Sequence, residues 1–313
     1  MKFRLHRWRI VSATVAVAAV ATLGVTGFPS PTAEFVEPFA EQSPFRAAIP
    51  ADAAVDPNSA AMIGAATSDG NVHAGLLEFG IPIFYADARS PRYDVRCLIS
   101  QWGPCPFDGL KIPIPDDAHP HTGSDGAMVV IDPDTHTSYE FWRAHKENGT
   151  WTTQFAAVND LNGSGWGGAS TGSGASRLAG VIRIAEVQQG RIPHALALQS
   201  NNVCAKTFRS PALKTDGRST RPDCLPEGAR LQLDPSLDID SLHLTPAEHM
   251  VAAAMQTYGG YVIDMSGSPL SMSFELDPEA HPGYIGPTYV DAGLRWDYDG
   301  MSDIPWQRLR VVR

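Results

Sequence analysis

Short runs of β-forming residues, separated by turn-forming residues, follow one another from Gly75 to the end of the chain. The clearest pair of runs surrounds Asn148-Gly149: the run 138–145 alternates toward this dipeptide, and the run 150–158 resumes after it. Asn-Gly accepts the positive φ that a two-residue hairpin turn requires at both central positions. The sequence therefore predicts a β-hairpin here, and the repeated pattern restricts the chain to a mainly β fold.

The remaining runs predict strands at 76–85, 93–99, 127–131, 194–199, 230–233, 261–265, 270–276 and 308–312. Only one long helix is predicted. Thr245 caps it, Pro246 suits its first position, an apolar stripe at helical spacing follows, and Gly259-Gly260 ends it. A shorter helix is predicted from Ile184 to Gln189.

Many short strands and few helices favour a two-sheet β-sandwich, jelly-roll-like, with one or two short helices. We predict that residues 70–313 form this single domain, because about 245 residues fit one large sandwich. Residues 34–69 are rich in Ala, Pro and Asp without a sustained period, so we interpret them as a tether or loosely packed arm.

Residues 1–33 have the pattern of a secretory signal peptide. Lys2, Arg4, Arg7 and Arg9 precede an uncharged run over residues 10–29. We expect a secreted, extracellular protein with no stable membrane insertion after cleavage. An uncleaved N-terminal anchor stays open, because the run approaches the ~20 residues that span a bilayer. The cleavage site stays open as well.

The charge of the chain excludes nucleic-acid binding as a function class. The formal net charge is −10, from 24 basic and 34 acidic residues. Without the four basic residues of the leader, 20 basic residues face 34 acidic ones, a net charge of −14. A nucleic-acid-binding domain needs a basic surface instead. The hydrophobic share of 43% also excludes a disordered chain.

Four cysteines agree with export to an oxidising compartment. Cys97 and Cys105 bracket one short segment, and Cys204 and Cys224 bracket another. Three pairings are open to four cysteines. We expect neighbours to pair, since no Cys-x-x-Cys or nearby His pair supports a metal site.

Acidic residues inside aromatic strands indicate a carbohydrate-active site. Glu140 lies between Tyr139 and Phe141, and strand alternation puts it on the same face as Trp142. A glycosidase needs two carboxyl groups facing each other across a groove. We interpret Glu140 as an acid or nucleophile, Asp160 or Glu186 as its partner, and Trp142 and Trp166 as platforms on which sugar rings stack.

A second candidate set occurs in the segment 183–194. Glu186 is able to orient His194, which would serve as a base or substrate contact. Arg183 would anchor a substrate carboxylate. A polysaccharide lyase needs such a base beside a uronate. A satisfied core histidine is the competing interpretation.

Two further patterns carry less information. Gly168-Ala-Ser170-Thr-Gly172 matches the G-x-S-x-G pattern of serine esterases, but a glycine loop precedes it instead of the strand that this motif requires. The pairs Asp132/Asp134 and Asp238/Asp240 leave a structural calcium open. No other metal and no cofactor is predicted.

The segment from Ser124 to about Glu275 resembles a family of exported, mainly actinobacterial proteins of unassigned function. The likeness is carried by Ser124-Asp125, Met128-Val-Val-Ile-Asp132, Tyr139-Glu140, Asp160-Leu161, Leu178-Ala-Gly-Val-Ile-Arg183, Glu186, Gly190, Ile192-Pro-His194-Ala-Leu196, Gly228-Ala-Arg230-Leu-Gln-Leu-Asp234-Pro, Tyr258-Gly259 and Asp264. The resemblance covers about half of the chain and implies an extracytoplasmic, β-rich protein. Family members often carry His where this chain has Ala127.

Together these patterns predict a secreted carbohydrate-active enzyme acting on a polysaccharide or oligosaccharide. The acidic mature chain favours a glycoside hydrolase over a lyase, because it would repel acidic polymers. A non-catalytic secreted protein that binds glycans or cell walls is the main alternative, and a serine esterase at Ser170 is the second.

Overall fold

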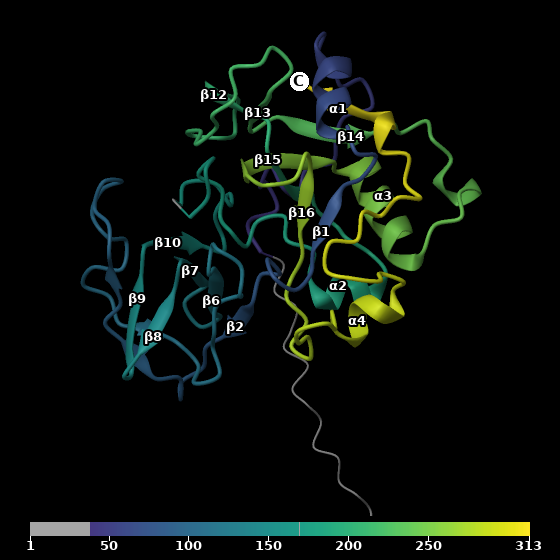
Figure 1. Ribbon diagram of the computed structural model, residues 1–313. Coiled ribbons are helices and arrows are strands. Elements are labelled where there is room, and N and C mark those ends of the chain that lie inside the picture. The colour runs from purple at the N-terminus through teal and green to yellow at the C-terminus, as the bar shows by residue number, and fades with distance from the viewer. Residues whose placement is uncertain (1–37, 169) are drawn as a thin grey trace, which may run out of the picture. The chain divides into compact units, whose positions relative to one another are not determined.

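Two mixed β-sheets carry most of the strands in the computed structural model, which describes residues 38–168 and 170–313 (Figure 1). The larger sheet has six strands in the order β1-β16-β11-β15-β14-β17. Their bounds are His73–Gly75, Ser271–Ser273, Leu196–Ser200, Gly260–Met265, Arg230–Leu233 and Leu309–Val312. The pairs β1/β16 and β11/β15 are parallel, and the other pairs are antiparallel.

The second sheet has four strands in the order β10-β7-β6-β2, with bounds Phe155–Asp160, Thr137–Trp142, Met128–Asp132 and Ile83–Tyr85. Three small sheets complete the strands. They pair β3 (Arg92–Tyr93) with β5 (Ile112–Pro113), β12 (Val203–Phe208) with β13 (Leu225–Glu227), and β4 (Arg96–Cys97) with β9 (Thr150–Thr153) and β8 (His145–Glu147).

The predicted hairpin is present and continues into the four-stranded sheet. Glu147 pairs with Thr150 across the turn, where Asn148 and Gly149 have φ values of 48° and 78°. Beyond Arg143, whose φ is also positive at 56°, the same two segments pair again as β7 and β10. Positive φ at both central turn positions is the reason that Asn-Gly suits this turn.

Four α-helices lie among the described residues: α1 (Ser59–Ala66), α2 (Ile184–Gln189), α3 (Pro246–Thr257) and α4 (Pro287–Asp291). Short 3-10 helices, η1 and η2, span Ile239–Ser241 and Trp306–Arg308. α2 has the bounds expected from the sequence. α3 begins with the expected cap, since the Thr245 hydroxyl accepts a hydrogen bond from the Glu248 N–H and the Glu248 carboxylate accepts one from Thr245 N–H.

The predicted tether requires correction over its described part, residues 38–69. Phe39 and Phe45 are buried, and α1 contributes Met62 and Ile63 to the main hydrophobic core. An irregular Ala- and Pro-rich composition hid these packing contacts, because only a few large apolar residues in the segment make them. The predicted leader, residues 1–33, lies outside the described residues.

Strand alternation divides the interior into layers. On β15, Val262 packs into the largest core cluster with α1 and α3, whereas Tyr261 and Ile263 pack into a second cluster. That second cluster also holds Val129 and Ile131 of β6, so it joins the two large sheets. Met128 and Val130 point to a third cluster on the other face of β6. Central strands of both sheets are therefore buried on both faces.

The mainly β class with few short helices is confirmed, but a jelly-roll sandwich is not. Jelly rolls are antiparallel, whereas three strand pairs in the two large sheets are parallel. Apolar alternation locates strands without fixing the direction in which neighbours run. Both expected disulfides, Cys97–Cys105 and Cys204–Cys224, are present. In the described ranges, no helix combines the length and apolar character that crossing a bilayer requires.

Candidate functional site

Glu140 fixes the segment 170–177 against β7. Its side chain is fully buried and accepts four hydrogen bonds. Oε1 accepts from the hydroxyls of Ser138 and Ser176, and Oε2 accepts from the Ser170 hydroxyl and, at 2.7 Å, from Arg177 N–H. A carboxylate has about four acceptor positions. All of them are used inside the protein, so Glu140 serves as a loop anchor.

The anchored segment ends in Arg177, whose guanidinium lies between two carboxylates. Nη1 lies 3.9 Å from Asp125 Oδ2, and Nη2 lies 4.0 Å from Asp264 Oδ2. Nη2 also donates to Ser170 O at 2.6 Å, and Asp125 accepts a 3.1 Å hydrogen bond from Trp142 Nε1. These contacts connect the four-stranded sheet with the carboxyl end of β15.

A β-bulge positions Asp264 near the end of β15. Leu198 of β11 pairs with Val262, but the next residue, Gln199, pairs with Asp264, so Ile263 is an extra residue without a partner on β11. Bulges bend a strand and change the direction of its side chains, and they are common next to functional sites. The bulge therefore sets the direction of Asp264, whose side chain keeps 19% exposure.

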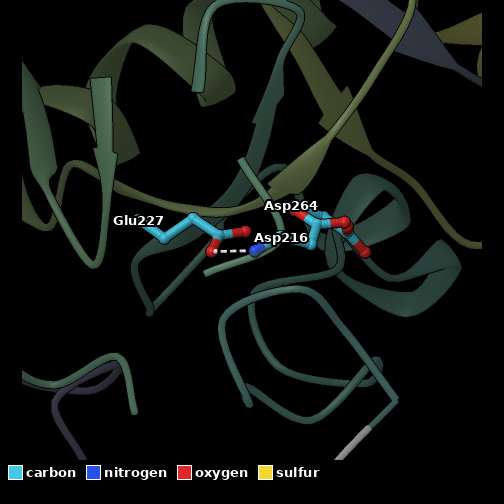
Figure 2. A group of neighbouring side chains, drawn as sticks. All are labelled: Asp216, Glu227 and Asp264. Atoms are coloured by element: carbon cyan, nitrogen blue, oxygen red, sulfur yellow. Dashed lines mark hydrogen bonds between the residues drawn. The ribbon is translucent and has the colours of Figure 1, made fainter. Parts of the chain in front are cut away.

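Two further acidic residues lie close to Asp264: Asp216 of the β12–β13 loop and Glu227 of β13. Glu227 ends β13, and the following Gly228 N–H donates to Val262 O at 2.8 Å, which holds Glu227 beside β15. Asp216 N–H donates to Glu227 Oε2 at 3.2 Å (Figure 2). The Cys204–Cys224 disulfide closes the loop that carries Asp216. Gly172 allows the close approach: a Cβ there would lie 2.5 Å from both Asp216 Oδ1 and Glu227 Oε1.

Two of the three carboxyl groups, those of Glu227 and Asp264, have raised pKa values. Burial raises the pKa of Glu227 to about 8, and the charges of Asp216 and Asp264 contribute to the same effect. Burial also raises the pKa of Asp264 to about 7; Arg177 opposes this effect, whereas Asp216 and Asp125 add to it. Close carboxyl groups of this kind share protons near neutral pH.

Asp216, Glu227 and Asp264 are also the residues in the described parts of the chain that could hold a metal ion. Their carboxylate oxygens lie within 4.8 Å of one another. A hard cation such as Ca²⁺ prefers oxygen ligands of this type, about six to eight in number. The positive charge of Arg177, 4.0 Å from Asp264, opposes a cation. Shared protons therefore suit this cluster better than a metal ion.

A cavity of about 440 Å³ opens onto the acidic cluster. Its lining includes the carboxyl groups of Asp125, Asp216 and Asp264, the guanidinium of Arg177 and the indoles of Trp102 and Trp142. The two indole rings are 5.2 Å apart between centroids, and Trp102 is 55% exposed. The cavity thus combines flat aromatic surfaces with three carboxyl groups.

The structure separates Glu140 from Asp160. Glu140 pairs with Ala157 across the sheet, whereas Asp160 pairs with Thr137 at the other end of the hairpin, about 10 Å farther along the strands. Asp160 is exposed, and its Oδ1 accepts the Asn162 N–H in a turn.

The two predicted platforms also have different surroundings. Trp142 lines the cavity described above. Trp166 packs against Phe45 and Tyr261 in the core cluster between the two large sheets, with ring centroids 5.3 and 5.7 Å away.

The candidates Arg183, Glu186 and His194 lie together, in a separate buried network. His194 Nε2 lies 2.9 Å from Glu186 Oε1, as the sequence led us to expect. Glu186 Oε2 accepts Arg183 N–H at the start of α2, and Arg183 Nε lies 3.1 Å from Glu275 Oε2. None of the three lines the cavity at the acidic cluster.

The remaining sequence patterns have local roles in the structure. Ser170 lies in the loop between β10 and α2, without the strand-turn-helix context of a nucleophile elbow. Asp132 Oδ1 accepts the Asp134 N–H within a turn. Asp240 pairs with His249 at 2.8 Å, and Asp238 is exposed.

Sequence reasoning did not select most of the residues at this site, namely Trp102, Asp125, Arg177, Asp216 and Glu227. Asp264 was one of many strand-end acids. A local signal does exist for it, because it follows the apolar run Tyr-Val-Ile of a strand buried on both faces.

Comparisons with known proteins give no match: no family model, no curated protein and no solved structure is similar to this chain.

Proposed function

We propose that this protein is a secreted glycoside hydrolase that uses Asp264 and Asp216 as its carboxyl pair. The observation that carries the proposal is the cavity that these two residues line together with the exposed indole of Trp102 and its neighbour Trp142. Flat apolar faces beside carboxyl groups suit sugar rings, which present C–H faces and hydroxyl edges.

The two carboxyl groups differ in environment, and this difference assigns their roles. Asp264 is largely buried and has a raised pKa, so it would stay protonated and act as the general acid. Asp216 is exposed and would act as the nucleophile. Glu227, buried behind both, would position Asp216 through the hydrogen bond from the Asp216 N–H.

The separation of the pair predicts the stereochemical outcome. One oxygen of Asp216 and one of Asp264 lie within 4.8 Å of each other, so the two carboxyl groups are close together. Retaining glycosidases have the closer spacing of carboxyl groups, about 5–5.5 Å, whereas inverting enzymes need about 6.5–9.5 Å to admit a water molecule. We therefore expect Asp216 to attack the anomeric carbon while Asp264 protonates the departing glycosidic oxygen, and water then to release the product from Asp216 with its configuration retained.

Export remains part of the proposal. Two disulfides favour an oxidising compartment, and the leader pattern and the resemblance to exported actinobacterial proteins agree with it.

The test is hydrolysis of a panel of polysaccharides, followed by a reducing-end assay. Asp264→Asn and Asp216→Asn should each lower turnover by about 10²–10⁴-fold, the usual range for removing an acid–base group. Asp160→Asn is the matched control, because Asp160 is exposed and lies outside the cavity. NMR of the first product should show the retained anomer.

Two results would refute the proposal. Full activity in Asp264→Asn would exclude this carboxyl pair. Binding to a polysaccharide without any product would favour the non-catalytic glycan-binding alternative.

A further inference from the structure

A second cavity, of about 600 Å³, adjoins the first. The two share Asp125, Thr171, Arg177, Asp264 and Met265 as lining residues, so they meet at Asp264. A polysaccharide bound through both cavities would therefore have an internal part of its chain, and not an end, at Asp264.

The second cavity contains no acidic or basic side chain beyond those shared residues, apart from two histidines, within the described parts of the chain. Its polar groups are hydroxyls and an amide. Gln199 donates to Ser273 Oγ at 2.9 Å and accepts from Ser271 Oγ at 3.3 Å. Side chains of this kind both donate and accept, which matches the hydroxyl groups of an uncharged sugar.

Aromatic side chains occur at this end as well. Phe79 and Tyr298 line the second cavity, and Phe79 is 37% exposed. Phe79 lies 5.6 Å from the ring of His121, and burial lowers the pKa of His121 to about 4, so the imidazole is neutral at neutral pH. Aromatic side chains therefore line both cavities, Phe79 and Tyr298 in the second and Trp102 and Trp142 in the first.

The charges of the joined cavities disfavour an anionic chain. Arg177 already faces Asp125 and Asp264, so its positive charge is compensated inside the protein. Lys214 is the remaining basic residue of the lining, against the acidic Asp125, Asp216 and Asp264. The lining therefore has no excess of positive charge that would attract a polyuronate.

From these contacts we infer that the substrate is an uncharged polysaccharide, bound across both cavities so that it is cleaved within the chain. This inference rests on the proposed function for the cleavage step. The binding step is independent of it.

Affinity electrophoresis of the purified protein in gels that contain a polysaccharide tests the binding step. We expect gels with neutral glucans, mannans, galactans or arabinans to retard the protein, and gels with polygalacturonate or alginate not to retard it. Trp102→Ala changes the first cavity and Phe79→Ala the second, and each should weaken retardation by a neutral polymer about fivefold. Phe208→Ala is the control, because Phe208 is 44% exposed and lies outside both cavities.

Different failures are distinguishable. If Phe79→Ala binds like Phe208→Ala, or if polyuronates bind better, the inference is overturned whether or not the protein hydrolyses anything. If neutral polymers bind through both cavities but no product forms, the hydrolase proposal fails and the binding inference stands. If products form only from chain ends, the inference of internal cleavage is overturned while the hydrolase proposal stands.

Discussion

Replacing Glu140 distinguishes an anchor from a catalyst, because the two roles predict opposite results. A catalytic carboxylate lost in Glu140→Gln would abolish turnover and leave stability nearly unchanged. The structure predicts a loss of stability instead, since the buried carboxylate accepts four hydrogen bonds that hold the segment 170–177. The size of the loss depends on which donors find new partners.

In Glu140→Ala all four donors lose their acceptor. Arg177 N–H belongs to the backbone and has no freedom to turn, so it takes the full penalty of a buried unpaired donor, about 1–3 kcal/mol. The three serine hydroxyls each lose a charge-assisted bond of about 1.5 kcal/mol or more, part of which is recovered when they rotate. We expect a total of about 4–6 kcal/mol, which is a large fraction of a typical stability of about 5–15 kcal/mol.

Glu140→Gln should be much milder, at about 1–2 kcal/mol. The amide oxygen still accepts from Ser170 and Arg177 N–H, and the amide N–H₂ donates to Ser138 and Ser176 after their hydroxyls rotate. This graded response, with alanine far worse than glutamine, is the expected property of an anchor.

Thermal and urea unfolding of the two variants measure these losses. For a chain of this length, 1 kcal/mol shifts Tm by about 2–4 °C, so Glu140→Ala should melt roughly 10 °C or more below the wild type. Glu147→Gln is the control, because Glu147 is exposed on β8. Equal Tm values for wild type and Glu140→Gln, together with loss of all hydrolysis, would refute the anchor role. If Glu140→Ala does not fold, Glu140→Gln still provides the comparison.

Three further results follow from the same contacts. First, the pKa values of Glu227 and Asp264 are raised to about 8 and about 7, so these groups hold protons in the folded protein that they release in the unfolded chain. The free energy of unfolding should therefore fall as pH rises from 6.5 to 8. Glu227→Gln should flatten this dependence in urea unfolding, and an unchanged slope would contradict the pKa shift; His121 does not interfere in this window, because its lowered pKa acts below pH 6.5. Second, removing the Cys204–Cys224 disulfide by a double Ser substitution should cost about 3 kcal/mol of stability and lower kcat, because it releases the loop of Asp216. Removing Cys97–Cys105, whose loop carries Trp102, should cost about as much stability but weaken substrate binding instead. An unchanged kcat in the first variant would count against Asp216. Third, Gly172→Ala places a Cβ 2.5 Å from Asp216 Oδ1 and Glu227 Oε1 and should lower kcat at least tenfold (about 1.4 kcal/mol in the barrier) by displacing Asp216; kinetics at wild-type level would show that the cluster tolerates displacement.

Local patterns predicted the elements well because the forces that define them are local. The Asn148-Gly149 turn, the Thr245 cap and the strand at 230–233 each depend on a few neighbouring residues, and each is present in the structure. Sheet topology depends on which strands meet across long separations, and alternation contains no such information. The parallel pairing of β11 with β15 was therefore not predictable from either strand alone.

The candidate site shows even more clearly that a local pattern does not predict which distant segment will contact a side chain. Strand alternation predicted that Glu140 and Trp142 share a face of β7. Their surroundings nevertheless differ, because Trp142 lines a cavity and Glu140 is covered by the segment 170–177, about thirty positions later in the chain. An acid beside an aromatic residue on a strand is thus an ambiguous signal, because the covering segment decides between an anchor and a reactive group.

Asp264 is the reverse case. It follows a strand buried on both faces, where an acid is costly unless it is protonated or compensated, and Arg177 compensates it only from 4.0 Å. An incompletely compensated acid at the end of an apolar strand is consequently the better sequence criterion for a functional carboxyl group in this chain.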